Sequence, residues 1–244
     1  MKGRLVLRTD LTPATRDAMR ALLDQHFAGV TPEQFTADLA EKNWIILLDD
    51  EHGRLRGFTT LHVYETHFRG EMLSVVYSGD TIVDREAWGS RTLLVTWLAA
   101  VMHLRQSYPH GRYYWLLLSS GFRTYRFLPV FWREFFPRFD AATPPETQAL
   151  LDHLTATRFR DRYDRNTGIV RFDRPQMLRE GLRDIPAERL SDPHIAFFAA
   201  RNTGHVAGDE LVTLTEMTPE NLTNAGRRML VAGSEMFAPE PVAS

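Results

Sequence analysis

The stretch Asp80-Thr-Ile-Val-Asp-Arg-Glu-Ala-Trp-Gly-Ser-Arg-Thr-Leu-Leu94, which continues as an apolar run to Leu104, decides the fold of this chain. Residues 73–83 predict a buried strand, residues 84–90 a short polar turn, and residues 93–104 a helix with almost no polar face. A strand that enters a helix through a Gly/Ser turn directs free N–H groups and a positive dipole end toward one spot. Such a spot suits a phosphate or another anion.

Composition indicates an ordinary globular protein. The chain has 244 residues, of which 43% are hydrophobic and 25% charged, and its net charge is −2. The absence of cysteine excludes disulfides, thiolate metal sites and a cysteine nucleophile. The N-terminal residues lack a secretory signal, and the longest apolar run, roughly ten residues from position 93, is shorter than the ~20 needed to cross a bilayer. We therefore expect a soluble, cytoplasmic protein.

Elements on either side of the central stretch predict a mixed sheet. Residues 4–9 alternate as a first strand, and Thr12-Pro13 and Thr31-Pro32 each combine a helix cap with a proline at the first helical position. The strands that follow are predicted at residues 44–48, 55–64 and 112–118, with a partly helical segment at 122–136. The fold class is therefore α/β, an α+β mixed sheet with helices on both faces.

The character of the chain changes after Phe139. Residues 141–145, Ala-Ala-Thr-Pro-Pro, indicate a boundary between residues 1–140 and a C-terminal α+β extension, residues 141–244, packed on them. In the extension, the pattern predicts helices at 145–163, 175–182 and 218–230 and strands at 168–172, 195–200 and 210–214.

The order of elements over residues 4–138 resembles the GNAT (Gcn5-related acyltransferase) superfamily, in which the fourth strand leads into the main cofactor helix. The pyrophosphate loop of that family reads Arg/Gln-x-x-Gly-x-Gly/Ala. Arg85-Glu-Ala-Trp-Gly-Ser90 keeps the first Arg and a small final residue, but Trp88 stands where the first Gly belongs. A second registration aligns Val83-Asp84 with the strand end of the family and puts Trp88 at the Arg/Gln position and Arg91 at the first Gly. The resemblance implies a GNAT-like acyltransferase domain over residues 1–140.

The resemblance also implies a donor and a site for it. The donor would be acyl-CoA, or an acyl carrier protein, and the acyl group would pass to an amine or similar nucleophile of a small molecule, with no metal. Main-chain amides of residues 88–92 would hold the pyrophosphate, within a site made of Val83, Arg85, Trp88, Gly89, Ser90, Arg91 and Thr92. The alternative is a plain strand-to-helix turn capped by Ser90.

Three residues are candidates for proton transfer, which acyl transfer requires. Tyr125 lies where the family often carries its catalytic acid, although it could equally be a core aromatic residue. Asp80 and Glu65 are candidates for the base. Asp80 could instead cap a turn, Glu65 could be merely solvated, and a water relay could replace either.

Residues 122–139 interleave aromatic residues with arginines. The pattern fits a half-buried helix whose arginines reach solvent, an apolar channel for an acyl chain, the seam of a homodimer, or a surface for single-stranded nucleic acid. The near-neutral charge makes nucleic acid the weakest of these hypotheses, and a membrane partner is not expected. The rival to an enzyme is a non-catalytic GNAT-like binding or assembly module that uses this segment.

Overall fold

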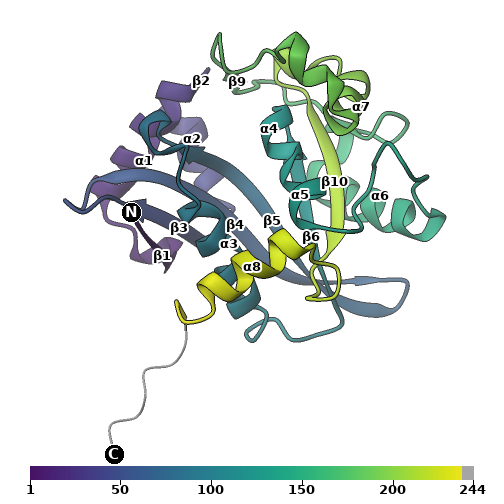
Figure 1. Cartoon of the computed structure of the whole chain (residues 1–244), viewed down its shortest axis with the longest axis horizontal. Helices are drawn as coiled ribbons and strands as arrows, with labels where there is room; N and C mark the ends of the chain where they lie inside the picture. The colour runs from purple at the N-terminus through teal and green to yellow at the C-terminus, as the bar shows by residue number, and fades with distance from the viewer. Residues whose placement is uncertain (238–244) are drawn as a thin grey trace, which may run out of the picture.

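The computed structural model describes residues 1–237, and an eight-stranded mixed sheet runs through them. The strand order is β1-β3-β4-β5-β6-β10-β8-β7 (Figure 1). β5 and β6 are parallel, and the other neighbours pair antiparallel. The strands are β1 (Lys2–Leu7), β3 (Trp44–Asp49), β4 (Leu55–Phe68), β5 (Glu71–Val83), β6 (Arg112–Ser119), β7 (Tyr163–Asp164), β8 (Ile169–Val170) and β10 (Glu210–Glu216). The predicted α/β mixed sheet is confirmed.

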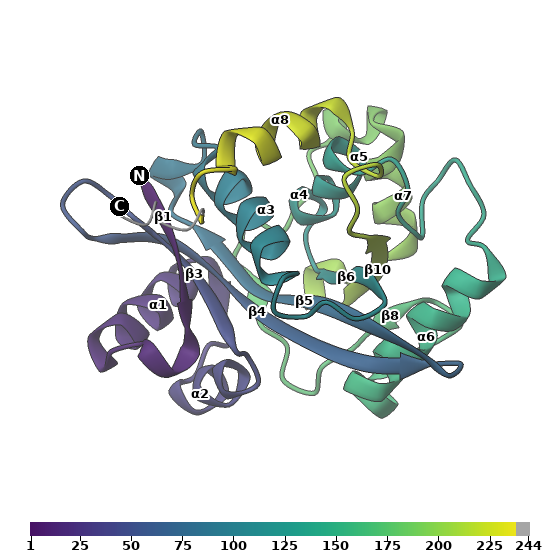
Figure 2. The same ribbon diagram turned by 90° about the horizontal axis from the view of Figure 1, so that it is seen from below.

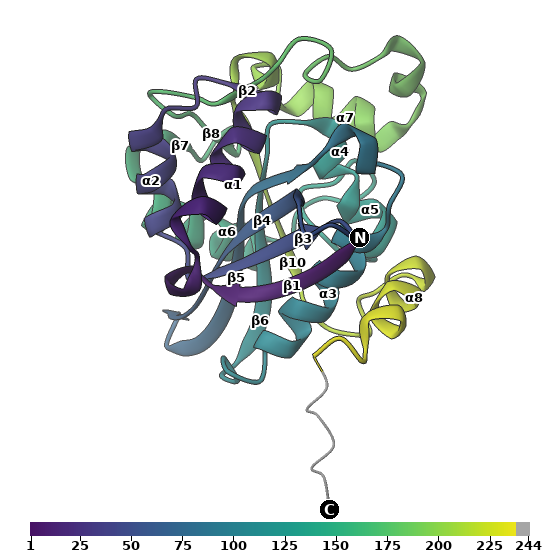
Figure 3. The same ribbon diagram turned by 90° about the vertical axis from the view of Figure 1, so that its left-hand side faces the viewer.

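Helices cover both faces of the sheet (Figure 2). The face that we call the α3 face carries α3 (Thr92–Leu104), α4 (Phe122–Tyr125), α5 (Phe127–Phe131), α7 (Pro193–Arg201) and α8 (Asn224–Gly233). The opposite face, the α6 face, carries α1 (Pro13–His26), α2 (Pro32–Ala40) and α6 (Pro145–Phe159). Viewed from the β1 edge, α1 and α2 lie on one side of the sheet and α3 and α8 on the other (Figure 3). The apolar α3 is therefore central, as its sequence predicts.

The first two helices begin as the sequence predicts. Thr12 and Thr31 are the N-caps of α1 and α2, and their hydroxyls accept hydrogen bonds from the N–H groups of Thr15 and Gln34. Each cap is followed by a proline, whose missing N–H has no intrahelical partner to lose.

Three predictions in the C-terminal part are wrong. Residues 195–200, predicted as a strand, belong to α7, because Asp192 caps that helix and Pro193 begins it. Residues 175–182, predicted as a helix, contain only the short strand β9 (Met177–Leu178), which pairs with β2 (Phe27–Ala28). The last helix begins at Asn224 after the cap Thr223, six residues later than the predicted start at 218.

The two predicted domains share one sheet. β10 and β8, which come from residues 141–244, continue the sheet directly beyond β6. The boundary at residue 140 stays a prediction, and residues 238–244 of the extension lie outside the described part of the chain.

Most aromatic rings of residues 122–139 point into the core. Those of Phe122, Tyr125, Trp132 and Phe135 are buried, and Phe139 is exposed. This burial favours the half-buried segment among the four readings. Within residues 1–237, the structure contains no helix that is long and apolar enough to cross a membrane.

Candidate functional site

β5 and β6 separate halfway along the sheet. Their parallel pairing runs from Leu73 and Arg112 to Ser78 and Leu117. Beyond these residues β5 continues against β4 as far as Val83, and β6 continues against β10. The two strands therefore diverge and leave an opening in the sheet on the side of the turn that leads to α3 (Figure 1).

A β-bulge lies where the opening begins. On β4, Thr59 pairs with Thr81 and Leu61 with Ser78, so Gly79 and Asp80 stand together opposite Thr60. A bulge adds one residue to a strand and changes the face to which the following side chains point. As a result, Tyr77 and Asp80 point to the same face, the α6 face, although their positions differ by an odd number.

Four charged side chains lie on the α6 face beside the bulge, near enough to influence one another's ionisation, and we call this group the acidic cleft. Asp38 comes from α2, Lys42 follows α2, Asp80 lies on β5, and Glu210 begins β10. The three carboxyl groups are half-buried, and each is close enough to influence the ionisation of the others. Burial raises the pKa of Glu210 to about 8 and that of Asp38 to about 6, and the Asp80 charge adds to both shifts. Burial also raises the pKa of Asp80, and the charge of Lys42 opposes that rise.

Lys42 is the buried cation of the acidic cleft. The residue is 7% exposed, and its Nζ donates a hydrogen bond to the main-chain oxygen of Asp38 at 2.9 Å. Burial lowers the pKa of Lys42, as expected for an ammonium group that loses water. A Cβ atom on Gly79 would lie 2.6 Å from Lys42 Cε and 2.5 Å from Thr60 Oγ1. Glycine at position 79 is therefore what lets both side chains lie over the bulge.

Arg158 of α6 closes one side of the acidic cleft. Its guanidinium group lies 4.1 Å from the ring centre of Tyr77 and pairs with Glu41 at 2.8 Å. Arg158 and Glu41 also border an adjoining groove of about 380 Å³, lined by His62, Tyr64, Thr66, His153, Leu154 and Thr157. The acidic cleft thus adjoins an open groove between β4 and α6.

Residues 174–182, which we call the strap, cross the opening (Figure 1). On one side, Gln176 Nε2 donates a hydrogen bond to Asp38 Oδ2 at 3.3 Å, and β9 pairs with β2. On the other side, Leu178 lies 3.1 Å from where a Cβ atom of Gly121, just after β6, would be. The strap therefore connects α2 with the end of β6.

The α3 face of the opening is apolar. A cavity of about 50 Å³ lies there, against Ser78, Thr81 and the rings of Trp97, Trp115 and Trp132. Trp115 Nε1 donates a hydrogen bond to Ser78 Oγ at 3.0 Å, and the ring of Trp97 lies 4.3 Å from that of Trp115. This volume accommodates a group of a few atoms.

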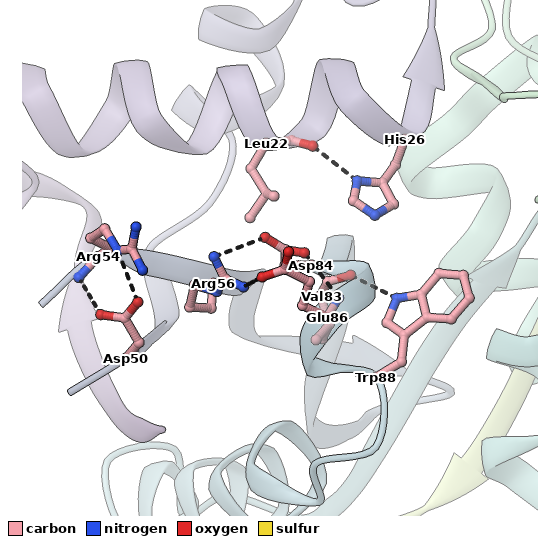
Figure 4. Close-up of polar contacts among 9 residues, drawn as sticks. All are labelled: Leu22, His26, Asp50, Arg54, Arg56, Val83, Asp84, Glu86 and Trp88. Carbon is pink, nitrogen blue, oxygen red and sulfur yellow. Dashed lines mark hydrogen bonds and ion pairs between the residues drawn. The ribbon is translucent and has the colours of Figure 1, made fainter. Parts of the chain in front are cut away.

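The turn between β5 and α3 is held together by internal hydrogen bonds. Asp84 accepts the N–H of Glu86, and both carboxylates contact Arg56 (Figure 4). The N–H groups of residues 88, 90 and 92 donate to Arg85 O, Ala87 O and Ser90 Oγ, respectively. Among the amides of residues 88–92, those of Gly89 and Arg91 have no acceptor in the described part of the chain.

Trp88 folds back onto the strand end. Its Nε1 donates a hydrogen bond to Val83 O at 2.8 Å (Figure 4), and the residue is 48% exposed. The guanidinium groups of Arg85 and Arg123 lie 5.9 and 5.6 Å from its ring centre. Burial and the charges of Arg189 and Arg85 lower the pKa of Arg123. Two arginines therefore flank one exposed indole beside the turn, and the charge of a third, Arg189, acts on Arg123.

The structure separates the three predicted catalytic residues. Asp80 lies in the acidic cleft. Glu65 lies near the far end of β4, where its carboxylate bonds to His110 Nδ1 at 2.7 Å and this hydrogen bond lowers its pKa. Tyr125 is 0% exposed and its hydroxyl donates to Pro137 O at 3.1 Å on the α3 face, where burial raises its pKa. The assignments of Glu65 and Tyr125 stay predictions, and Asp80 is the candidate that adjoins the opening.

Sequence reasoning missed Asp38, Lys42, Glu210 and Arg123. The sequence offered one reason to single out Lys42, because lysine occurs only at positions 2 and 42 of this arginine-rich chain. Nothing in the sequence marked Asp38, Glu210 or Arg123 as site residues. Each comes from a separate element, and only the fold brings them to the opening.

A larger cavity lies elsewhere. A space of about 550 Å³ at the opposite end of β5 and β6 is bordered by Leu73, Arg112 and Glu216. None of the predicted site residues lines it. This larger cavity is therefore separate from the opening between β5 and β6.

Similarity to known proteins is found among solved structures alone. No protein-family model matches the chain, and neither does any curated protein. Among solved structures, a probable N-acyltransferase from Enterococcus faecalis V583 is 13% identical with a TM-score of 0.40, and the match covers 55% of this chain and 33% of that one. This chain thus spans about a third of the length of the enterococcal protein.

Two further neighbours carry more specific descriptions. The GNAT family N-acetyltransferase YhbS from Escherichia coli, in complex with CoA, is 16% identical with a TM-score of 0.37 over 49% of this chain and 64% of that one. Glucosamine-6-phosphate N-acetyltransferase from Arabidopsis thaliana is 16% identical with a TM-score of 0.34 over 47% of this chain and 82% of that one. These neighbours carry acyltransferase or acetyltransferase descriptions, and the matches cover about half of this chain at low sequence identity, in agreement with the GNAT-like fold expected from the sequence.

Proposed function

We propose that the chain is an acyltransferase that moves an acyl group from acyl-CoA to an amine of a small molecule. The opening between β5 and β6 carries this proposal. One strand, β5, places the carboxylate of Asp80 at the edge of the opening and then leads, through residues 84–91, to the N-terminus of α3. A carboxylate for the acceptor and an anion site for the donor therefore adjoin one gap in the sheet.

The donor side is suited to phosphate groups. The first turn of α3 contains no acidic side chain, so the positive end of its dipole is not neutralised locally. Arg85, Arg123 and Arg189 add positive charge nearby, and guanidinium groups bind phosphate oxygens in a bidentate manner. The exposed indole of Trp88 offers a flat surface on which an adenine ring can stack.

The acceptor side is suited to proton transfer. In the proposed step, the amine nitrogen attacks the thioester carbonyl carbon, a C–N bond forms, and the C–S bond breaks. The sulfur leaves with the bonding electron pair and takes a proton from solvent, while the amine proton passes to the Asp80 carboxylate. A carboxyl group whose pKa is raised by burial is a better base than an ordinary one.

Calorimetric titration with CoA and acetyl-CoA tests the donor side. We expect Gly89→Val to weaken binding by about tenfold, because a side chain at this position would enter the space that a diphosphate needs. The change should spare the fold, since no atom lies within 4 Å of a Cβ atom on Gly89. We expect replacement of Arg85 and Arg123 by Gln to weaken binding more strongly, and more so at low ionic strength.

Arg16→Gln on the exposed surface of α1 is the matched control and should bind CoA like the original chain. Absence of binding to CoA, acetyl-CoA and longer acyl-CoA donors would refute the proposal for CoA donors. Acyl groups carried by an acyl carrier protein would then be tested in the same way.

A further inference from the structure

We infer that the cavity of about 550 Å³ at the far end of β5 and β6 is a second binding site, which takes a protonated amine attached to an apolar body. The cavity lies where the parallel pairing of the two strands begins, at Leu73 and Arg112. From Leu73 to Ser78, where the pairing ends at the opening, β5 extends about 16 Å. This site is therefore distinct from the opening, and the inference does not depend on acyl transfer.

The floor of the cavity is apolar. Leu73 of β5, Tyr114 of β6, Leu214 of β10 and Leu150 of α6 line it, and all four are buried members of one hydrophobic cluster on the α6 face. The volume falls within the range of about 300–1,000 Å³ that is usual for small-molecule sites. The floor therefore suits the apolar body of a small ligand.

The hydroxyl of Tyr114 is a polar group without a partner. The residue is 6% exposed and lines the cavity, and in the described part of the chain its hydroxyl makes no hydrogen bond. Burial raises the pKa of this hydroxyl to about 12, and the charge of Arg112 opposes that rise. Three carboxylates that also border the cavity add to it, those of Glu216, Glu146 and Glu71. An ammonium group placed among these carboxylates could donate a hydrogen bond to the hydroxyl oxygen.

Carboxylates outnumber cations around the cavity. Its charged lining residues are Glu71, Glu134, Glu146, Glu216 and Glu220, together with Arg112 and Arg133. Arg112 is engaged by the wall itself, because its Nε donates to Glu216 Oε1 at 3.0 Å and its guanidinium group lies 5.1 Å from the ring centre of Tyr114. The other four glutamates are exposed, so a ligand can reach them. A cation is therefore the ligand whose charge complements this lining.

Hydrogen bonds hold one wall of the cavity in place. Asn221 Nδ2 donates to the main-chain oxygens of Glu134 and Glu216 at 3.0 and 2.9 Å, and Asn221 Oδ1 accepts the N–H of Glu134 at 2.8 Å. Thr215 Oγ1 also donates to Glu134 O, at 2.6 Å. The segment after α5 is thus fixed to the end of β10. The backbone that carries the Glu134 carboxylate is preorganised, which reduces the entropy that binding would cost.

Calorimetric titration with three probes that share one apolar body tests the inference. N,N-dimethyl-2-phenylethylamine is a cation at neutral pH, 2-phenylethanol is uncharged, and 3-phenylpropionate is an anion. A tertiary amine cannot form an amide, so the first probe is not an acyl acceptor. We expect the amine to bind about fivefold more tightly than the alcohol, and the propionate to bind most weakly. Added salt should weaken amine binding, and Asp80→Asn, at the opening, should leave it unchanged.

Variants of the lining locate the bound amine. Glu71→Gln combined with Glu134→Gln should weaken amine binding about fivefold and leave alcohol binding unchanged. Both side chains are exposed, so their replacement should spare the fold. Tyr114→Phe removes the hydroxyl without changing a charge and should weaken amine binding about two- to threefold. Glu33→Gln is the matched control, because it removes the same charge from the exposed side of α2, and it should have no effect.

Equal affinity for the amine and the alcohol overturns the inference, as does a loss in Glu33→Gln as large as that in the double variant. Weaker amine binding in Asp80→Asn also overturns it, because the amine would then lie at the opening. Tighter binding of the propionate would overturn it by assigning the cavity to an anion, with Arg112 and Arg133 as its partners. These titrations contain no CoA, so their outcome is independent of the donor proposal.

Discussion

The two faces of the sheet differ sharply at one point of β5. On the α3 face, Ser78 lies among the rings of Trp97, Trp115 and Trp132, and its hydroxyl accepts the indole N–H of Trp115. On the α6 face, Asp80 lies two residues further along among the charged groups of the acidic cleft. One face is apolar at this point, and the other carries four ionisable side chains.

The difference shows what each face contributes. An apolar, hydrogen-bonded face stabilises the place where two strands separate and backbone pairing is lost. Charged groups held close together cost stability, and proteins keep such groups where they act on a ligand. The bulge at Gly79 and Asp80 lets one strand serve both purposes, because it turns an extra side chain toward the α6 face.

Of the changes that test this difference between the two faces, removal of the Asp80 charge should have the largest effect, a loss of activity. If Asp80 accepts the amine proton, Asp80→Asn should lower kcat by about 10²- to 10⁴-fold, the usual contribution of a general base. The measurement is the rate of CoA thiol release with an amine acceptor, together with CoA affinity, which should be unchanged.

Glu65→Gln makes the same change of charge at the other predicted base, beside His110. We expect a much smaller loss for that variant. A loss equal to that of Asp80→Asn would contradict the assignment of Asp80.

Glu210 should make the stability of the fold fall as the pH rises. Its pKa is near 4.5 in an unfolded chain and about 8 in the fold, so between these values the folded state holds a proton that the unfolded state has released. Stability contributed by the protonated form is therefore lost from pH 4.5 to pH 8. We expect Glu210→Gln to be more stable than the original chain by about 2–3 kcal/mol at pH 8.5, and by little at pH 5.

Urea unfolding at a series of pH values measures this difference. The gap between the two proteins should widen with pH and level off above about pH 8. A gap that is constant across the series would mean that the carboxyl group of Glu210 ionises normally.

A side chain added at Gly79, over the bulge, should change the free energy of unfolding less than the ionisation of Glu210 does. A methyl group at Gly79 would meet Thr60 Oγ1 at 2.5 Å and Lys42 Cε at 2.6 Å. We expect Gly79→Ala to destabilise the fold by about 1–3 kcal/mol, as overpacking does. Gly89→Ala is the control, because its methyl group would meet nothing within 4 Å, and it should stay within about 0.5 kcal/mol. Equal values for the two variants would show that Lys42 and Thr60 move aside freely.

The smallest change in stability should follow a substitution on the α3 face. Ser78→Ala removes the acceptor of the Trp115 indole N–H and leaves a buried donor without a partner. The expected loss is about 1 kcal/mol in thermal or urea unfolding. Ser191→Ala, at the exposed last residue of the 3₁₀ helix Ala187–Ser191, should change stability by less than half as much. A similar value for both would mean that the indole finds another acceptor.

Local patterns predicted the parts of the fold that local physics decides. The caps Thr12 and Thr31 predicted where α1 and α2 begin, and the apolar run from Leu93 predicted the central helix α3. Residues 195–200 were predicted as a strand because their apolar side chains are contiguous. Asp192 and Pro193, which begin a helix there, decided the outcome.

The acidic cleft could be predicted only in part. Strict alternation puts Tyr77 and Asp80 on opposite faces, and only the pairing with β4 reveals the bulge that brings them together. Glu210 begins a strand whose neighbours in the sheet cannot be read from its own sequence. Asp80 was found because it precedes the turn, whereas its partners depend on long-range pairing.

The burial of Lys42 has a practical consequence for handling the protein. Lysine occurs at positions 2 and 42 alone, so Lys2, which is exposed, is the one lysine side chain at the surface. Acyl thioesters react slowly with exposed lysines without any enzyme, and this surface offers them a single such target. A fluorophore or cross-linker that reacts with lysine would accordingly attach at β1, on the edge of the sheet.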